Sequence, residues 1–244
     1  MLAETKILLD LWEPGMGTPQ LYQAALDSGR FATMSARRLR NLVAECFAPR
    51  LLVRDGKAAS ELKLLGPSLS SHEFEQVLFV HTCRATAILA AFVREVYWDA
   101  YTAGRNTLSN QDARDFVVCA NQDGRTTKPW SDSTRRRVAG YLTGACADFG
   151  LLERGTRNVR RILPFRIMPR VAILLACDLH FSGLGDNAVL SHPDWALFGL
   201  DRSAVLDELK RLALRGLFIV QTAGNITRIA WQCRTVEELK DAIA

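Results

Sequence analysis

The chain has 244 residues, a formal net charge of +5 and a pI of about 9.0. Hydrophobic residues make up 48% and charged residues 23%, which is an ordinary globular composition and excludes a globally disordered chain. The longest apolar stretches, 85–93 and 171–177, are far shorter than the ~20 residues that span a bilayer. The first twelve residues mix charges with apolar side chains, unlike a signal peptide. We therefore expect a cytoplasmic protein without a membrane partner.

Helical patterns dominate the first half of the chain. Apolar spacing predicts helices over residues 3–11, 18–26, 35–47, 70–101 and 109–120. Thr18 and Ser35 are predicted to cap the second and third helices, and Ser109 with Asp112 forms a capping-box pattern. His81 falls on the apolar face of the 70–101 helix, which favours a core histidine over a ligand.

A further helix is predicted to begin at Trp130–Ser133, after a polar loop over residues 121–129. Its apolar spacing predicts one buried stripe, made of Val138, Tyr141, Leu142, Ala145, Cys146 and Phe149. The stretch that follows, 154–166, has no helical period, so strands or an extended arm are both open there.

The C-terminal part follows a different order. Helices are predicted over 169–181, 201–215 and 235–243, with a short turn at 186–191 and strands at 217–220 and 226–231 joined by a turn at 222–225. Helices followed by a hairpin are typical of a winged helix. We therefore expect a mainly α fold of two helical domains. The first covers residues 1–167 and includes a basic segment, 125–167, and the second is a winged-helix-like domain over 168–244.

Basic residues are concentrated between Arg125 and Arg170, where eleven of them face three acidic residues. That stretch carries +8 and the remainder of the chain −3. Ten of the eleven are arginine, whose planar guanidinium suits phosphate. The candidate nucleic-acid-binding residues are Arg125, Lys128, Arg135, Arg136, Arg137, Arg154, Arg157, Arg160 and Arg161.

A lone triplet such as 135–137 is most simply a solvated helix face. If the 154–161 group packs against that helix, about eight guanidiniums share one surface, and phosphates would relieve their repulsion. Trp130 either stacks on a base or packs at the helix entry. The predicted 201–215 helix exposes charges of both signs, which suits structural or protein-binding use as well as groove reading.

Catalytic, metal and cofactor patterns are missing from the sequence. The six cysteines form no CxxC pair, no histidine lies at ligand spacing from them, and no HExxH, GxSxG or P-loop string occurs. Asp194 followed by Glu208-x-Lys210 resembles a metal-dependent nuclease pattern, but that chemistry needs the acid-x-Lys pair on a strand, and this pair lies in a helical pattern. We expect a non-enzymatic protein with no metal and no cofactor.

Several strings resemble the BrxA family, a component of BREX bacteriophage-exclusion systems. They are 130–135 (WSDSTR), 194–200 (DWALFGL), 216–221 (GLFIVQ) and 229–231 (IAW), and the likeness extends to the 3–11 helix. The resemblance implies a small cytoplasmic protein of two mainly helical domains, one similar to the NusB type of antitermination factor. It also implies a positively charged groove for double-stranded DNA, and partners that include the methyltransferase and ATPase components of BREX.

Charge alone leaves the polyanion undetermined. Duplex DNA is favoured over RNA or an acidic protein by the family resemblance, and no residue-level binding motif comes with it. An adaptor that docks other BREX components and an RNA-binding protein of NusB type are the alternatives.

Overall fold

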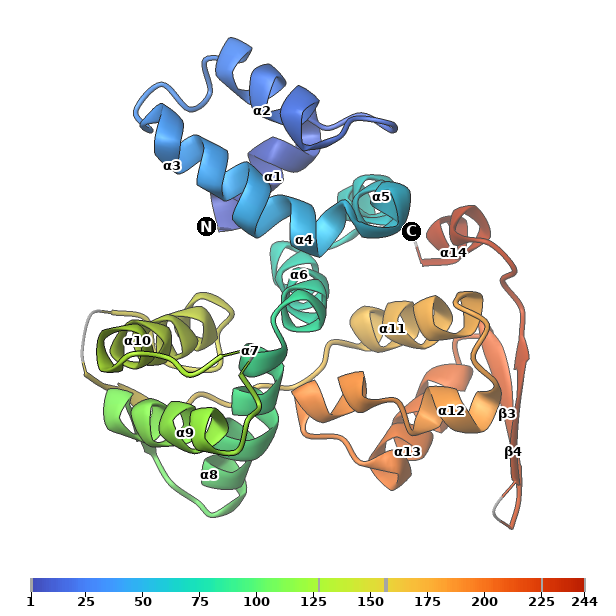
Figure 1. Ribbon diagram of the computed structural model, residues 1–244. Coiled ribbons are helices and arrows are strands. Elements are labelled where there is room, and N and C mark those ends of the chain that lie inside the picture. The colour runs from blue at the N-terminus through green and yellow to red at the C-terminus, as the bar shows by residue number, and fades with distance from the viewer. Residues whose placement is uncertain (1, 127, 156–157, 225, 244) are drawn as a thin grey trace. The chain divides into compact units, whose positions relative to one another are not determined.

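The computed structural model describes residues 2–126, 128–155, 158–224 and 226–243. The fold is mainly helical, as predicted, with a small β-hairpin near the C-terminus (Figure 1). The chain forms two compact units. Unit 1 combines Met1–Ala85, Met168–His192 and Arg202–Ala244, and unit 2 combines Thr86–Ile167 and Pro193–Asp201. The predicted boundary at 167/168 is thus one of four points at which the chain passes between units.

The N-terminal part of unit 1 is built from short helices. They are α1 (Leu2–Leu11), α2 (Thr18–Asp27), α3 (Ala36–Asn41), π-helix η1 (Leu42–Phe47), α4 (Ala48–Leu51), α5 (Val53–Leu65), 3₁₀-helix η2 (Gly66–Ser68) and α6 (Ser71–Ala85). Ser35 caps α3 as predicted, since its hydroxyl accepts a hydrogen bond from Arg38 N. The predicted Thr18 cap is wrong: Gly17 holds the extended N-cap position of α2, and Thr18 is already helical.

The C-terminal part of unit 1 contains α11 (Pro169–Phe181), α12 (Asp186–Leu190), α13 (Arg202–Ala213), β3 (Phe218–Ala223), β4 (Ile226–Trp231) and α14 (Val236–Ile243). The predicted hairpin is confirmed, but its strands pair as far as Ala223 and Ile226, so the turn is tighter than 222–225. Asn225, predicted in that turn, lies outside the described residues. Asp186 fixes the hairpin to α12 by accepting hydrogen bonds from Ile229 N (2.9 Å) and Trp231 Nε1 (3.1 Å).

The single helix predicted over 70–101 is wrong. Thr86, with φ −132° and ψ 81°, ends helical geometry between α6 and α7 (Ala87–Phe92), which continues through π-helix η3 (Val93–Tyr97) into α8 (Trp98–Thr102). The apolar spacing runs across the break because α6 and α7 each bury a stripe of their own, α6 in unit 1 and α7 in unit 2. The spacing of apolar residues therefore does not predict the break at Thr86.

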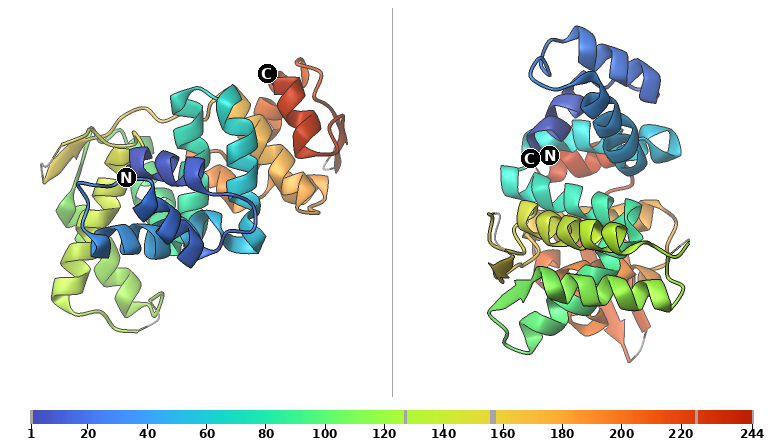
Figure 2. Two further views of the ribbon diagram at one scale, coloured as in Figure 1. Left: turned by 90° about the horizontal axis from the view of Figure 1, so that it is seen from above. Right: turned by 60° about the vertical axis from the view of Figure 1, so that its left-hand side comes forward.

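Unit 2 is completed by β1 (Thr107–Ser109), α9 (Asn110–Gln122), α10 (Asp132–Asp148), β2 (Val159–Arg161) and 3₁₀-helix η4 (Pro193–Phe198). Helices α9 and α10 lie side by side (Figures 1 and 2). Strand β2 pairs antiparallel with β1, so the strand alternative for 154–166 is confirmed over 159–161. The Ser109–Asp112 capping box of α9 is also confirmed.

The 193–201 segment packs against α8 in unit 2. Trp98 Nε1 donates a hydrogen bond to Leu197 O (3.1 Å), and the rings of Phe165 and Phe198 stack with centroids 5.5 Å apart. Gly199 has φ +69°, and a Cβ there would lie 2.6 Å from the Trp98 ring. Only glycine combines that backbone angle with so close an approach.

The buried stripe of α10 is shifted around the helix from the predicted one, because Ala139 and Ala147 are buried whereas the predicted Val138 and Ala145 are only half-buried. Leu142, Cys146 and Phe149 are buried as predicted, but Tyr141 is 67% exposed. Thr143 is buried in its place and donates a hydrogen bond to Asn110 Oδ1 (2.6 Å), which satisfies its hydroxyl. The spacing of apolar residues cannot predict the burial of a polar residue such as Thr143, whose hydroxyl finds its partner inside the fold.

Within the described ranges, no single helix has both the length and the apolar character needed to cross a membrane. Ser71–Ala85 and Ala87–Thr102 reach that threshold only when counted together across the break at Thr86.

Candidate nucleic-acid interface

The predicted basic residues all belong to unit 2. Unit 2 contains thirteen basic and ten acidic residues, so its net charge is only +3. The +8 of the 125–170 stretch is offset by carboxylates from outside it, among them Glu95, Asp112 and Asp123. Arg157 lies outside the described residues. The local pairing of each remaining cation therefore decides which of them face a polyanion.

The structure places the candidates in two groups at opposite ends of α10. Asn121 Oδ1, in α9, accepts a hydrogen bond from Trp130 N (2.7 Å) just before α10, whereas Asn110, at the start of α9, contacts Thr143 near the other end. The two helices therefore run antiparallel. From Arg135 to the last residue of α10 is about 20 Å at ~1.5 Å per residue. The triplet and the 154–161 group do not merge into one cluster.

At the start of α10, Asp132 is the common acid for three arginines. Arg136 Nη2 lies 2.6 Å from Asp132 Oδ2, while Arg114 and Arg135 approach Oδ1 at 3.8 Å. The Arg135 side chain is 27% exposed, and its Nε is buried without a hydrogen-bond partner among the described residues. One carboxylate therefore faces three guanidiniums, and the local charge stays positive.

Arg137 lies one residue further along α10 and is exposed. Within the described part of the chain it has no acidic partner. Tyr141 follows it by four residues, so the two side chains are neighbours on the exposed face of the helix. We call Lys128, Arg114, Arg135, Arg136 and Arg137 the α10 entry cluster.

Arg125 is the candidate most fully engaged within the protein. Its Nη1 donates to both Glu95 carboxylate oxygens (2.8 and 2.9 Å), and its guanidinium lies over the Phe116 ring. The hydrogen bond to Glu95 raises the pKa of Arg125 above its ordinary value. Lys128, by contrast, is exposed and has no acidic partner among the described residues. Binding a phosphate at Arg125 would have to compete with Glu95.

The second group makes mostly backbone contacts. Arg154 Nη2 donates to Asp148 O (3.3 Å) at the C-terminal end of α10, where a cation complements the free carbonyls. Arg160 Nη1 donates to Glu153 O (3.2 Å), and Arg160 Nε is buried and unpaired among the described residues. Arg161, on β2, is exposed. Arg154 and Arg160 thus stabilise the fold in addition to any external contact.

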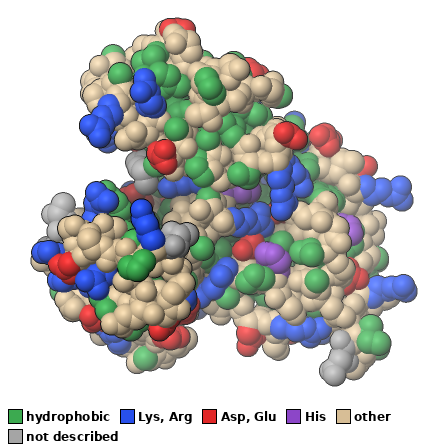
Figure 3. Space-filling model, in the orientation of Figure 1, with side chains coloured by type: hydrophobic (Ala, Val, Ile, Leu, Met, Phe, Trp, Pro, Cys, Tyr) green, Lys and Arg blue, Asp and Glu red, His purple; other side chains and the backbone are tan. Residues whose placement is uncertain are grey.

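The surface view agrees with this division. On the face shown in Figure 3, blue Lys and Arg side chains over α9 and α10 are interspersed with red carboxylates and tan atoms and form no continuous patch. Sequence reasoning missed Arg114, because it lies outside the basic stretch. It missed Tyr141 as a surface residue because the buried stripe of α10 is shifted around the helix from the predicted one.

The acidic residues of the nuclease-like pattern lie on two helical elements, Asp194 on η4 and Glu208 on α13. Glu208 and Lys210 lie on α13, in the helical setting predicted for them. Arg211 binds Glu208 with its Nε 2.9 Å from Oε2, so that carboxylate is engaged in a surface ion pair. Among the described residues, no three His, Cys, Asp or Glu side chains gather as metal ligands.

The fold and the site together define a mainly helical protein whose candidate nucleic-acid-binding cations are spread over one unit. A family model places the chain more closely: the BrxA model matches residues 1–177, and the chain belongs to the BrxA family. It is therefore a component of a BREX phage-defence system. The matched range ends within α11, so α12, α13 and the hairpin lie beyond it. No curated protein matches the chain significantly.

Proposed function

We propose that this protein is a non-enzymatic, cytoplasmic DNA-binding accessory component of its BREX system. The α10 entry cluster would contact the phosphate backbone of duplex DNA. The observation that carries this proposal is the accessibility of Lys128 and Arg137, two cations that no described carboxylate neutralises. Nearby, the three guanidiniums that share Asp132 retain positive charge.

Duplex DNA suits both groups of cations. It carries a phosphate charge every ~1.7 Å of its axis, counting both strands. Two groups about 20 Å apart along α10 can therefore contact one duplex without a shared cluster. Arg161 is the exposed member of the second group, and Arg154 and Arg160 position the backbone beside it. Contacts of this kind predict little sequence readout.

The test uses Lys128→Glu/Arg137→Glu, because neither side chain makes an ion pair or a side-chain hydrogen bond among the described residues. The control, Arg37→Glu/Arg234→Glu, makes the same change in net charge at exposed positions of unit 1. Binding to a duplex of about 25 base pairs would be followed by fluorescence anisotropy over a salt series. We expect at least tenfold weaker binding for the first variant only. Its slope of log K against log salt should be smaller by up to ~1.8, at ~0.9 per lost phosphate contact.

Equal affinities for the first variant and the unaltered protein would contradict the proposed site. Equal losses in both variants would show a general charge effect. Tighter binding of structured RNA than of duplex DNA would favour an RNA-binding function of NusB type.

An adaptor role is the second candidate, because α13 presents charges of both signs, including the Arg211–Glu208 pair. The order of α11, α12, α13 and the β3–β4 hairpin suits the predicted winged-helix-like docking domain. Its partners would be the methyltransferase and ATPase components of BREX. Co-purification with them that survives nuclease treatment would support this role, and loss of co-purification after nuclease treatment would count against it.

A further inference from the structure

Unit 1 contains a polar pocket with a cavity volume of about 520 Å³. Residues of α4, α5, α6 and α11 line it, together with residues after α11 and His192 after α12. The volume falls within the range of small-molecule sites, roughly 300–1,000 Å³. A neighbouring apolar cavity of about 50 Å³ is too small for such a ligand.

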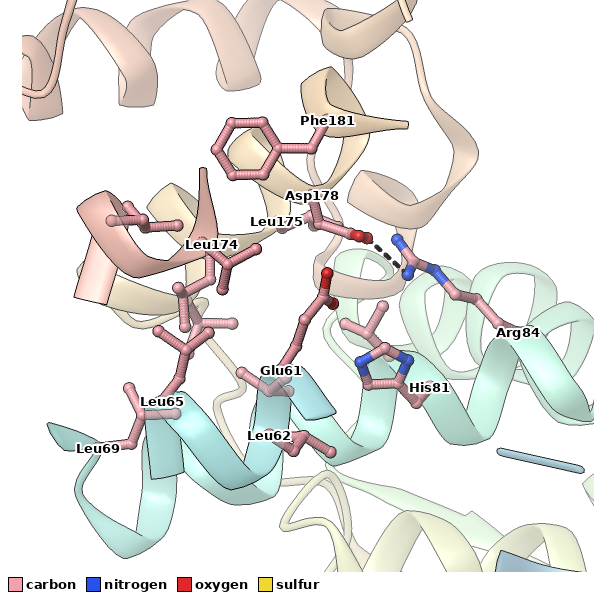
Figure 4. Close-up of a pocket in the computed structure, with 15 residues that line it drawn as sticks. Glu61, Leu62, Leu65, Leu69, His81, Arg84, Leu174, Leu175, Asp178 and Phe181 are labelled. Atoms are coloured by element: carbon pink, nitrogen blue, oxygen red, sulfur yellow. Dashed lines mark ion pairs between the residues drawn. The ribbon is translucent and has the colours of Figure 1, made fainter. Parts of the chain in front are cut away.

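The two cavities share a polar wall made of Glu61, His81, Arg84 and Asp178. Figure 4 shows Glu61, His81, Arg84 and Asp178 together, with Leu65 and Leu174 on the other side of Glu61. The ion pair between Arg84 Nη1 and Asp178 Oδ2 is 2.7 Å long (Figure 4). This wall is already neutralised within the protein, so it does not determine what the larger pocket would bind.

The charge of the larger pocket is set by its other cations. Lys57 pairs with Glu61 at 3.6 Å, as Arg84 does with Asp178. Arg50 and Arg54 also line the pocket, and neither has an acidic partner among the described residues. Two guanidiniums therefore remain unneutralised. We call the larger cavity, with these two arginines, the Arg50–Arg54 pocket.

Arg50 is half-buried, and an unneutralised guanidinium out of water is unfavourable. Burial lowers the pKa of Arg50 below its ordinary value, which reflects that cost. A bound anion would neutralise the guanidinium and so remove this unfavourable free energy. Arg50 thus differs from an exposed surface arginine, whose charge water solvates.

Arg54 reaches the pocket through an unusual backbone. Residues 54, 55 and 56 have φ values of 52°, 56° and 76°, a left-handed run in which only the last is glycine. Such conformations cost about 1–2 kcal/mol for each non-glycine residue. Gly56 fixes the run against Trp12, because a Cβ at Gly56 would lie 2.6 Å from that ring. The fold therefore holds Arg54 at the pocket at an energetic cost.

We propose that the Arg50–Arg54 pocket binds a small phosphate-bearing molecule, with its phosphate between the two guanidiniums. Two guanidiniums that line one pocket suit a doubly charged phosphate, because each presents two parallel N–H donors. Pro49, Val53 and Leu179 supply an apolar side to the same cavity for the remainder of the ligand. This site belongs to unit 1 and is separate from the α10 entry cluster in unit 2.

The experiment is a calorimetric titration of the full chain with pyrophosphate and with adenosine monophosphate at low salt. We expect saturable binding of at least one probe. Arg50→Gln and Arg54→Gln should each weaken it by about tenfold or more, because each removes a charge-assisted pair of hydrogen bonds. Arg37→Gln, an exposed arginine outside the pocket, is the matched control and should bind like the unaltered protein.

The Arg54→Gln variant keeps the test informative if Arg50→Gln fails to fold, because Arg54 is exposed. No saturable binding of either probe, or equal binding by Arg54→Gln and Arg37→Gln, would overturn the proposal. A third outcome would also overturn it: weaker binding of duplex DNA by Arg54→Gln, with no binding of either small molecule by the unaltered protein. These arginines would then bind nucleic acid. The α10 entry cluster variant leaves this titration unchanged, so failure of one proposal is distinguishable from failure of the other.

Discussion

Single residues hold the 193–201 segment in unit 2, and Gly199 is the most constrained of them. A methyl group there would meet both an unfavourable φ of +69° and the Trp98 ring at 2.6 Å. We predict that Gly199→Ala lowers the free energy of unfolding by about 2–5 kcal/mol, from left-handed strain and overpacking together.

Gly104→Ala is the matched control, because its φ is +73° with no atom within 4 Å of an added Cβ. It should cost only the strain component, about 1–2 kcal/mol. Urea denaturation of both variants measures the difference. Equal losses would mean that the contact with Trp98 has no energetic weight.

Asp112 gives the fold an acid-sensitive contact. Burial by itself raises the pKa of this carboxyl, but hydrogen bonds from the Ser109 hydroxyl and N–H and from Arg105 outweigh it and lower the pKa below the ordinary 3.8. Because the pKa of Asp112 is lower in the folded than in the unfolded protein, its ionised form stabilises the fold at pH values above the unfolded-state pKa. That stability is lost as pH falls through the folded value.

We therefore expect Asp112→Asn to be less stable than the unaltered protein at about pH 6, and the difference to shrink below about pH 4. Denaturant midpoints across that range would measure it. A difference that stays constant with pH would show that the charge of Asp112 contributes nothing.

Helix α10 contains two glycines on its solvent side. At Gly140 and Gly144 an added Cβ would meet no atom within 4 Å. We predict that Gly140→Ala and Gly144→Ala each stabilise the protein by about 1 kcal/mol, because alanine loses less backbone entropy in a helix. Thermal unfolding would show it as a higher midpoint. The reverse exchange, Ala145→Gly, should lower the midpoint. A lower midpoint for Gly140→Ala or Gly144→Ala would contradict the prediction.

At the scale of elements, the sequence was most informative where a local rule decides the structure. The Ser35 cap, the Ser109–Asp112 capping box and the hairpin depend on a few adjacent residues, and each was predicted. The break at Thr86 could not be predicted, because the apolar stripes of α6 and α7 follow each other without a gap in spacing. Long-range packing decides that break.

The candidate site was predictable in composition but not in arrangement. A count of charges along the chain found Arg136 and Arg137, yet it could not show that Glu95 would occupy Arg125. Nor could it show that Arg154 would lie at the far end of α10. The Arg50–Arg54 pocket had no signal in the sequence, because its lining joins residues 49–85 to residues 178–192, which are far apart along the chain.

At the scale of the whole molecule, residues 1–167 and the compact units divide the chain differently. Within unit 1, α11 contacts α6 through Arg84–Asp178 and through Met168 N, which donates to Gln76 Oε1 (2.8 Å). We predict that a 1–167 fragment unfolds non-cooperatively, because α6 lacks this partner. Near-ultraviolet circular dichroism during heating would measure it. A sharp transition like that of the full chain would instead support an independent 1–167 domain.

The four passages of the chain between the units also set an order of events during synthesis. When Ala85 leaves the ribosome, α6 has been made, but α11, which contacts it, is still more than eighty residues away. Unit 2 also cannot complete its packing before residues 193–201 are made, because Leu197 contacts Trp98 and Phe198 stacks on Phe165. Neither unit can complete its fold before the final fifth of the polypeptide emerges. The apolar side chains of α6 therefore lack their native partners on α11 during most of translation.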